Sequence, residues 1–169
     1  MLAEHTCQEE HLPKGYELLT FGNLSRSELG REVEDAKLAA AGVDRGYFTF
    51  WKERLDGLQD DQAVEVVCQV LVFENPVDAS RFVTNLPAET SWLSVTVAGI
   101  PLSEGKSIPE VDLPDAKGTR GFRVEENEGR IRYAVITARK QFVLSVHLEG
   151  SENAASLSSA LAILEELAR

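Results

Sequence analysis

Three side chains that could bind a metal or act as nucleophiles lie within seven positions near the start of the chain: His5, Cys7 and His11. Imidazole nitrogens and a thiolate are ligands that Zn²⁺ prefers, and a neighbouring glutamate could supply a fourth. A structural zinc site usually joins ligands from separate elements, so that metal binding organises the fold. Here all the candidates fall in residues 1–12, a polar stretch without periodicity. We therefore predict a flexible polar tail with no bound metal, and keep a metal-binding protein as an alternative.

The second cysteine, Cys68, lies in the most apolar stretch of the chain, residues 63–73. Apolar residues recur there with a period of two, which is typical of a strand, and they also occupy most of the opposite face. We predict a central strand that is covered on both faces, in which Cys68 is a small buried side chain. A disulfide with Cys7 is left open, because it requires an exported protein and a tail that reaches this strand.

The third histidine, His147, falls on a predicted strand, close to Ser145 and opposite the apolar face of that strand. A general base needs a group that orients it, commonly a carboxylate, and the sequence does not place one. The GxSxG, P-loop, HExxH and GxGxxG motifs do not occur in the sequence. We therefore interpret His147 as a hydrogen-bonded residue of the sheet. The alternative is a small enzyme with a dispersed active site that includes His147, Asp112 and Arg120.

A long irregular segment, residues 100–119, contains three prolines. Segments of this length are uncommon in compact domains and often carry function. Its carboxylates could supply a few oxygens to a cation such as Ca²⁺, but their spacing fits no EF-hand. We predict a non-catalytic domain that binds a protein partner or a small ligand through this segment and the adjoining sheet. The candidate contacts are Trp92, Asp112, Asp115 and Arg120, with Trp92 as an aromatic anchor if it lies at a sheet edge.

The formal net charge of −11 limits the kinds of partner. A negative field repels the phosphates of nucleic acid and anionic membrane surfaces, so we expect neither as a partner. No apolar run approaches the roughly 20 residues of a membrane-spanning helix. No basic and then apolar leader opens the sequence. We therefore predict a cytoplasmic protein without a cofactor, either monomeric or homodimeric, with an exported mature form as the alternative.

The order of the predicted elements indicates the fold class. Periodicity and turn signals predict strands at 15–21, 46–54, 63–73, 91–99, 121–126, 130–138 and 142–150, and helices at 25–42, 75–87 and 152–169. Asn75 is a good N-cap for the second helix, and Pro76 suits its first position. Hairpins and a final meander favour antiparallel pairing. We predict an α+β fold, a mainly antiparallel sheet flanked by helices, as one domain over residues 13–169.

Part of this order resembles a known fold family. A strand with a glycine and aromatic residues is followed by a strand that ends in phenylalanine and by a helix with an alanine and an aromatic residue. The matching positions are Gly46, Tyr47, Trp51, Phe73, Ala79 and Phe82, preceded by the opening "HLPKGYELL". The chain is similar in these features to small bacterial domains of the PsbP-like α/β fold, which are often exported or lipid-anchored. The resemblance implies an accessory or binding module, although "EHTC" lacks the residues expected before a lipidated cysteine.

Overall fold

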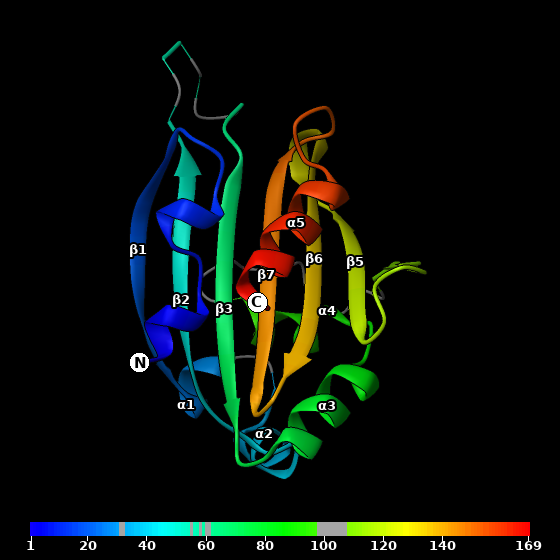
Figure 1. Ribbon diagram of the computed structural model, residues 1–169. Helices are drawn as coiled ribbons and strands as arrows, with labels where there is room; N and C mark the ends of the chain where they lie inside the picture. Colours follow the sequence, from blue (N-terminus) through cyan, green and yellow to red (C-terminus); the bar gives the residue numbers. More distant parts are fainter. Residues whose placement is uncertain (31–32, 55, 58, 60–61, 98–107) are drawn as a thin grey trace.

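The computed structural model describes residues 1–169 except 31–32, 55, 58, 60–61 and 98–107. Its centre is a seven-stranded antiparallel sheet in the order β1-β2-β3-β7-β6-β5-β4 (Figure 1). The strands are β1 (Tyr16–Ser25), β2 (Val43–Glu53), β3 (Glu65–Phe73), β4 (Glu110–Val111), β5 (Thr119–Glu125), β6 (Arg130–Arg139) and β7 (Phe142–Ser151). The α+β class and the mainly antiparallel sheet that we predicted are therefore confirmed.

Strand β3 lies at the centre of this sheet, between β2 and β7. Every residue of β3 from Val66 to Phe73 is buried. Val66, Cys68 and Val70 belong to the core on one face of the sheet, and Val67 and Leu71 belong to the core on the other. The prediction of a central strand covered on both faces is confirmed, because both alternating sets of side chains in this strand are buried.

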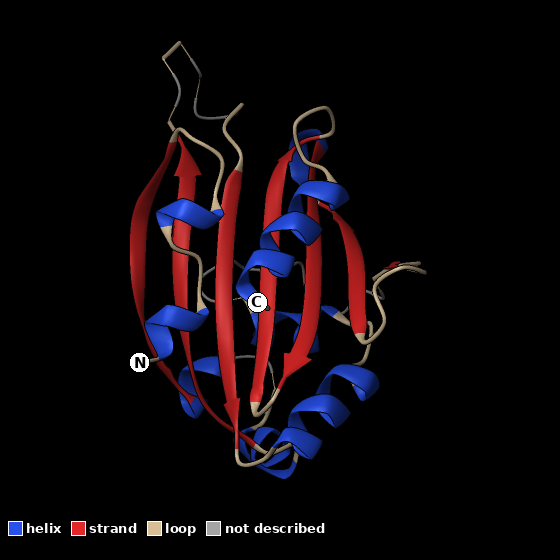
Figure 2. Cartoon of the chain, viewed as in Figure 1, coloured by secondary structure: helices blue, strands red, loops and turns tan. Residues whose placement is uncertain are grey.

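The helices form a layer on each face of the sheet (Figure 2). On the first face, α3 (Pro76–Asn85) packs against β6 and β7, and Phe82 contacts Phe73 with ring centroids 5.2 Å apart. On the second face, α5 (Leu157–Leu167) packs against the same two strands. The shorter helices are α1 (Arg26–Leu29), α2 (Asp35–Ala40), α4 (Thr90–Leu93), η1 (Leu2–His5), η2 (Glu9–His11), η3 (Ser94–Thr96) and η4 (Asn127–Gly129). Within the described residues, no helix is long and apolar enough to cross a membrane.

Two predicted helix starts are confirmed, and one predicted helix is shorter than expected. The side chain of Asn75 accepts a hydrogen bond from the backbone N–H of Asp78, so α3 begins as predicted. The Ser25 capping box is also formed at the start of α1. The helix predicted over 25–42 is nevertheless divided into α1 and α2. The chain turns back at Gly30 so closely that a Cβ there would lie 2.8 Å from the carbonyl oxygen of Val33, and a helix does not continue through that turn.

The strand predicted over 91–99 is wrong for the described residues of that segment. Residues 91–96 instead form the end of α4 and the 3-10 helix η3, in which Val95 and Thr96 are buried. The alternating polar and apolar residues imitate a strand, but the backbone lies over the sheet instead of within it. Its carbonyl oxygens accept hydrogen bonds from side chains of the sheet, from Gln69 Nε2 to Val95 at 2.7 Å and from Ser145 Oγ to Thr96 at 2.7 Å.

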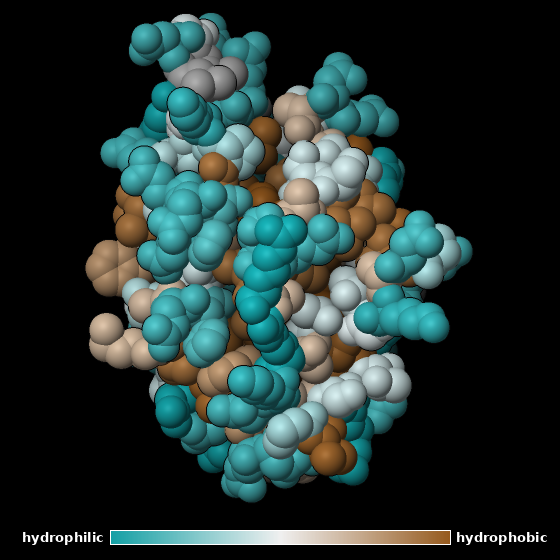
Figure 3. Space-filling model, viewed as in Figure 1, coloured by the Kyte–Doolittle hydropathy of each residue, from teal (hydrophilic) through white to brown (hydrophobic). Residues whose placement is uncertain are grey.

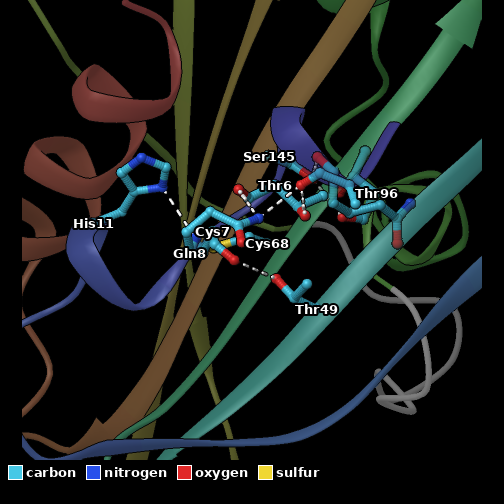
Figure 4. The surroundings of a disulfide bond; sticks show 10 residues. Thr6, Cys7, Gln8, His11, Thr49, Cys68, Thr96 and Ser145 are labelled. Atoms are coloured by element: carbon cyan, nitrogen blue, oxygen red, sulfur yellow. Dashed lines mark hydrogen bonds between the residues drawn. A yellow bond between two sulfur atoms is a disulfide. The ribbon is translucent and has the colours of Figure 1, made fainter. Parts of the chain in front are cut away.

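Residues 1–12 are not the exposed tail that we expected. They contain η1 and η2, and Cys7 is completely buried in a disulfide with Cys68 on β3, with 5.6 Å between the two Cα atoms (Figure 4). The hydroxyl of Thr49 on β2 donates a hydrogen bond to the carbonyl oxygen of Cys7 at 3.4 Å. The Cys7–Cys68 disulfide, which the sequence analysis left open, is therefore present. This N-terminal segment covers β2 and β3 on the same face as α5, next to the helix.

The Cys7–Cys68 disulfide closes a loop with a sequence separation of 61. Reduction should lower the free energy of unfolding by about 4 kcal/mol, because the bond restricts the unfolded chain over a loop of that length. Urea unfolding with and without reductant measures this difference. The Cys7→Ala/Cys68→Ala double variant is the control, and its stability should not respond to reductant. An unchanged free energy in the reduced protein would show that the N-terminal segment is held by its other contacts alone.

Candidate functional site

Arg120, a predicted binding residue, holds two parts of the fold together. Its Nε and Nη2 donate hydrogen bonds to both carboxylate oxygens of Glu110 at 2.7 and 3.0 Å. Its Nη1 donates to the carbonyl oxygens of Val83 at 3.0 Å and Leu86 at 2.5 Å, at the end of α3. The last carbonyl groups of a helix have no partner within the helix, so an arginine there satisfies them. Arg120 therefore fastens the end of α3 to β5 and Glu110.

Asp112 and Asp115 lie exposed just after β4, in the part of the 100–119 segment that the structure describes. Asp112 lines a shallow hollow of about 430 Å³ together with Glu110 and Lys117. Neither aspartate has an ion pair or side-chain hydrogen bond to another described residue. Residues 100–107 of the predicted binding segment lie outside the described residues. No contact in the described part of the chain brings the two aspartates together with Trp92.

Trp92 lies on α4, where it is half-buried against Phe82 of α3 with ring centroids 6.4 Å apart. The indole forms one wall of a cleft of about 220 Å³ at the end of α3. The remaining walls are apolar side chains of α2, α3 and the residues after α3, with two polar residues: Ala40, Ala41, Phe82, Leu86, Pro87, Arg81 and Asn85. Trp92 is therefore an aromatic residue at an accessible cleft, although it lies on a helix and not at a sheet edge.

A row of buried polar side chains lies on the face of the sheet that carries α3. Gln69 of β3 and Ser145 and His147 of β7 are each less than 3% exposed. They bind the segment above them: His147 Nε2 lies 3.0 Å from the hydroxyl of Thr96, and Gln69 and Ser145 donate to the carbonyl groups of Val95 and Thr96. The prediction that His147 is a hydrogen-bonded residue of the sheet is confirmed. These bonds hold η3 on the sheet.

Arg132 of β6 belongs to the same polar row, and the sequence analysis missed it. Its side chain is 1% exposed, and its Nη2 lies 2.7 Å from Glu149 and 3.2 Å from Glu126. Its Nε and Nη1, the Nδ1 of His147 and the Oε1 of Gln69 have no hydrogen-bond partner in the described part of the chain. Arg132 lies opposite Glu149 in the pairing of β6 with β7. Sequence periodicity does not give this register, so it did not identify the pair.

Burial controls the protonation of this polar row. Desolvation and the nearby Arg132 lower the pKa of His147 well below its usual value, so its imidazole is neutral near pH 7. Desolvation also raises the pKa of Glu126, although Arg132 opposes that shift. The described residues place no carboxylate in hydrogen-bonding contact with the ring of His147. Its Nε2 is instead bound to the hydroxyl of Thr96, which joins β7 to η3.

Contacts among the described residues form neither the dispersed active site nor the metal site that the sequence left as alternatives. Arg120 is bound to Glu110 and α3, Asp112 is exposed after β4, and His147 is buried under η3, so no contact joins the three. The three candidate metal ligands near the start of the chain have separate partners. Cys7 is in the disulfide, and His11 Nδ1 accepts a hydrogen bond from the backbone of Gln8 (Figure 4). The ring of His5 packs against Phe142. No group of three or more His, Cys, Asp or Glu side chains among the described residues could hold a metal ion.

The architecture is thus an antiparallel sheet with helices on both faces, fastened by a disulfide on one face and by a polar row on the other. Among solved structures, the chain is similar to the extracellular domain of PknH from Mycobacterium tuberculosis, with 14% sequence identity and a TM-score of 0.61. The match covers 98% of this chain and 94% of that chain. At this identity the similarity shows the fold alone. No family model and no curated protein matches the chain, and the PsbP-like resemblance is not confirmed.

Arg120→Met should lower the free energy of unfolding by about 1–3 kcal/mol, because it leaves the carbonyl groups at the end of α3 without their charged donor. Glu110→Gln should cost less than about 1 kcal/mol, because Glu110 is partly exposed and solvent screens the ion pair. Urea unfolding followed by circular dichroism compares the two variants with the wild type. Equal losses in both variants would show that the ion pair, and not the bonds to the carbonyl groups, is the stabilising contact.

The lowered pKa of His147 predicts a pH dependence of stability. In the pH range below the usual histidine pKa of about 6.5 the unfolded chain binds a proton more readily than the folded protein, so the free energy of unfolding should fall as the pH falls. Urea unfolding between about pH 7 and pH 5 measures the slope in the range where histidine titrates. His147→Gln should have a smaller slope, while Glu126, whose raised pKa acts in the opposite direction, is the same in both proteins. Equal slopes would contradict the prediction.

Proposed function

We propose that the protein is a non-catalytic binding domain that holds an apolar group of a protein partner or small ligand in the cleft beside Trp92. The observation that carries this proposal is the half-buried indole of Trp92, which forms a wall of an open cleft of about 220 Å³. A dry cavity of about 150 Å³ is known to bind benzene, so this cleft has room for one aromatic ring or a branched aliphatic chain. An indole provides a large, rigid apolar contact of the kind that anchors binding partners.

The polar residues of the cleft favour one charge and one orientation of the ligand. Arg81 is 64% exposed and is held to Asp78 by one long contact of 3.4 Å, so its guanidinium can turn toward a bound group. Asn85 adds an amide that can donate and accept. Guanidinium groups pair well with carboxylates. A ligand that carries a carboxylate next to its apolar part therefore suits the cleft better than one that carries an amine.

The other residues that we predicted from the sequence have different roles in this proposal. Arg120 stabilises one wall of the cleft, because it binds the carbonyl oxygen of Leu86, a residue that lines the cleft. Asp112 and Asp115 are exposed and offer two carboxylates to a basic partner at the β4 end of the sheet. The neutral, buried His147 supports binding over catalysis, since its Nε2 is engaged by Thr96.

We further propose that the protein works outside the cytoplasm, as an exported form. A buried disulfide that clamps the N-terminal segment onto the central strand is typical of proteins from oxidising compartments. The structural relative is itself an extracellular domain. Export is also what the PsbP-like resemblance implies. These observations favour the exported form over the cytoplasmic protein that we first predicted.

Titration with three matched probes tests the cleft: 3-phenylpropionate, 3-phenylpropanol and 3-phenylpropylamine. In nuclear magnetic resonance spectra the indole N–H signal of Trp92 reports on the site in every protein that keeps this residue, and the backbone N–H signals of Asn85 and Leu86, which line the cleft, report on it in all variants, including Trp92→Ala. We expect a saturable shift of the Trp92 signal with 3-phenylpropionate, with a Kd of about 1 mM, weaker binding of the alcohol, and the weakest binding of the amine. Trp92→Ala should abolish binding, and Arg81→Gln should remove the preference for the carboxylate.

Val77→Ala is the matched control, because Val77 is exposed on α3 but does not line the cleft. It should bind all three probes as the wild type does. The signal of Trp51, which is buried in the core on the other face of the sheet, should not move. Binding that survives Trp92→Ala, or the absence of a saturable Trp92 shift with every probe, would contradict the proposed site.

A further inference from the structure

The two edges of the sheet differ in how they are protected. At one edge, β4 has only two residues, Glu110 and Val111, and a proline lies close to each end of it. At the other edge, β1 has ten residues, from Tyr16 to Ser25, and among the described residues it pairs with β2 alone. A ten-residue antiparallel strand is about 34 Å long. The free edge of β1 therefore presents a long row of backbone groups that another strand could bind.

The side chains of β1 are unusually apolar for an exposed edge. Leu18, Leu19 and Phe21 are 38%, 40% and 60% exposed, and they are three of the five exposed large hydrophobic residues in the described part of the chain. Figure 3 shows brown and tan surface along the edge that carries β1. Leu18 is paired with Trp51 and Phe21 with Thr49, so both lie on the face of the sheet that carries the N-terminal segment, and their exposed fractions show that the described residues leave them only partly covered.

The usual devices that block an edge are few in β1. Natural proteins protect exposed edges with lysine, proline, short strands or bulges. β1 contains neither lysine nor proline. Its one charged residue, Glu17, is paired with Arg54, and its one irregularity is a register shift between Leu18 and Thr20. An edge of this length and composition is a site for strand pairing.

We propose that β1 pairs with β1 of a second copy of this chain, antiparallel and about a two-fold axis. The two sheets of seven strands then become one continuous sheet of fourteen. A two-fold axis brings the same patch of both copies together, so the apolar side chains of each β1 face those of the other. Pairing centred on Phe21 places the Phe21 side chains of the two copies opposite each other on one face of the sheet, and it keeps the two Glu17 residues at opposite ends of the paired strands.

The net charge of the chain predicts how this contact should respond to salt. Each copy carries a net charge of −11, so two copies repel each other, whereas β1 itself contributes a single paired carboxylate to the contact. Salt screens the repulsion between the copies over a Debye length of about 8 Å at physiological ionic strength. Association through an apolar, backbone-paired edge should therefore strengthen as salt is added. This inference is independent of the Trp92 cleft, which lies at the end of α3 and involves no residue of β1.

Sedimentation of the disulfide-intact chain tests the proposal from about 1 µM to about 1 mM, a range that spans weak and moderate affinities. We expect the mass to rise from 18.6 kDa to twice that value with concentration, and the dissociation constant to fall as salt is raised. Leu19→Lys and Phe21→Lys should each weaken the dimer at least tenfold. Val77→Lys, at a position that is 62% exposed on α3, is the matched control and should dimerise like the wild type.

Hydrogen exchange of the wild-type protein gives a second readout that needs no variant. The outward-facing amides of β1 should exchange more slowly at high protein concentration than at low concentration, while the amides of β4 should not change. A wild-type protein that is monomeric at every concentration would overturn the proposal and leave the edge to a strand of another protein. A dimer that Leu19→Lys and Phe21→Lys do not weaken, or that salt dissociates, would also overturn it.

Discussion

The burial of β3 on both of its faces is the constraint on which the rest of the structure depends. Val66, Cys68 and Val70 face one way, and Val67 and Leu71 face the other, so this strand cannot be exposed on either side. One helix covers only part of a sheet of this width. Each face therefore has a second, smaller cover: the N-terminal segment beside α5 on one face, and α4 with η3 on the face that carries α3.

The two smaller covers are held by different chemistry in addition to their apolar packing. The N-terminal segment has only three fully or largely buried residues, Thr6, Cys7 and Leu12, and it is held by a covalent bond to β3. η3 is held by hydrogen bonds from Gln69, Ser145 and His147. Burying these polar groups is favourable only because they find partners in the segment above them. The N-terminal segment is thus fastened to β3, and η3 is fastened to β3 and β7.

Local signals predicted the parts of the fold that local interactions determine. The cap at Asn75, the apolar strand β3 and the meander from β5 to β7 each depend on neighbouring residues or on short turns, and each is present. The errors concern residues whose environment is set by distant partners. Residues 91–97 alternate like a strand, but side chains of β3 and β7 bind their carbonyl groups. Cys7 lies in a polar sequence, but its partner is 61 residues away.

The same distinction between local signals and distant partners applies to the candidate site. Trp92 was proposed from its residue type, since aromatic side chains near an irregular segment are frequent anchors. Its cleft could not be predicted, because the walls come from α2, α3 and α4, and only the fold brings these together. Arg120 has the residue type of a binding group, but its geometry makes it a support. Arg132 was missed altogether, because its meaning depends on the register that places Glu149 opposite it.

The positions of these features are compatible with both of the contacts that we propose. Arg120 binds the carbonyl oxygen of Leu86, which lines the Trp92 cleft, so the ligand that we propose would meet a wall that is already fixed by this bond. The edge of β1 is different, since its recognition groups are backbone amides and carbonyls that any extended strand can match. No residue of β1 lines the cleft, whose walls come from α2, α3, α4 and the residues after α3. Occupation of one site therefore leaves the other open, and a dimer formed through β1 would present two clefts to its partners.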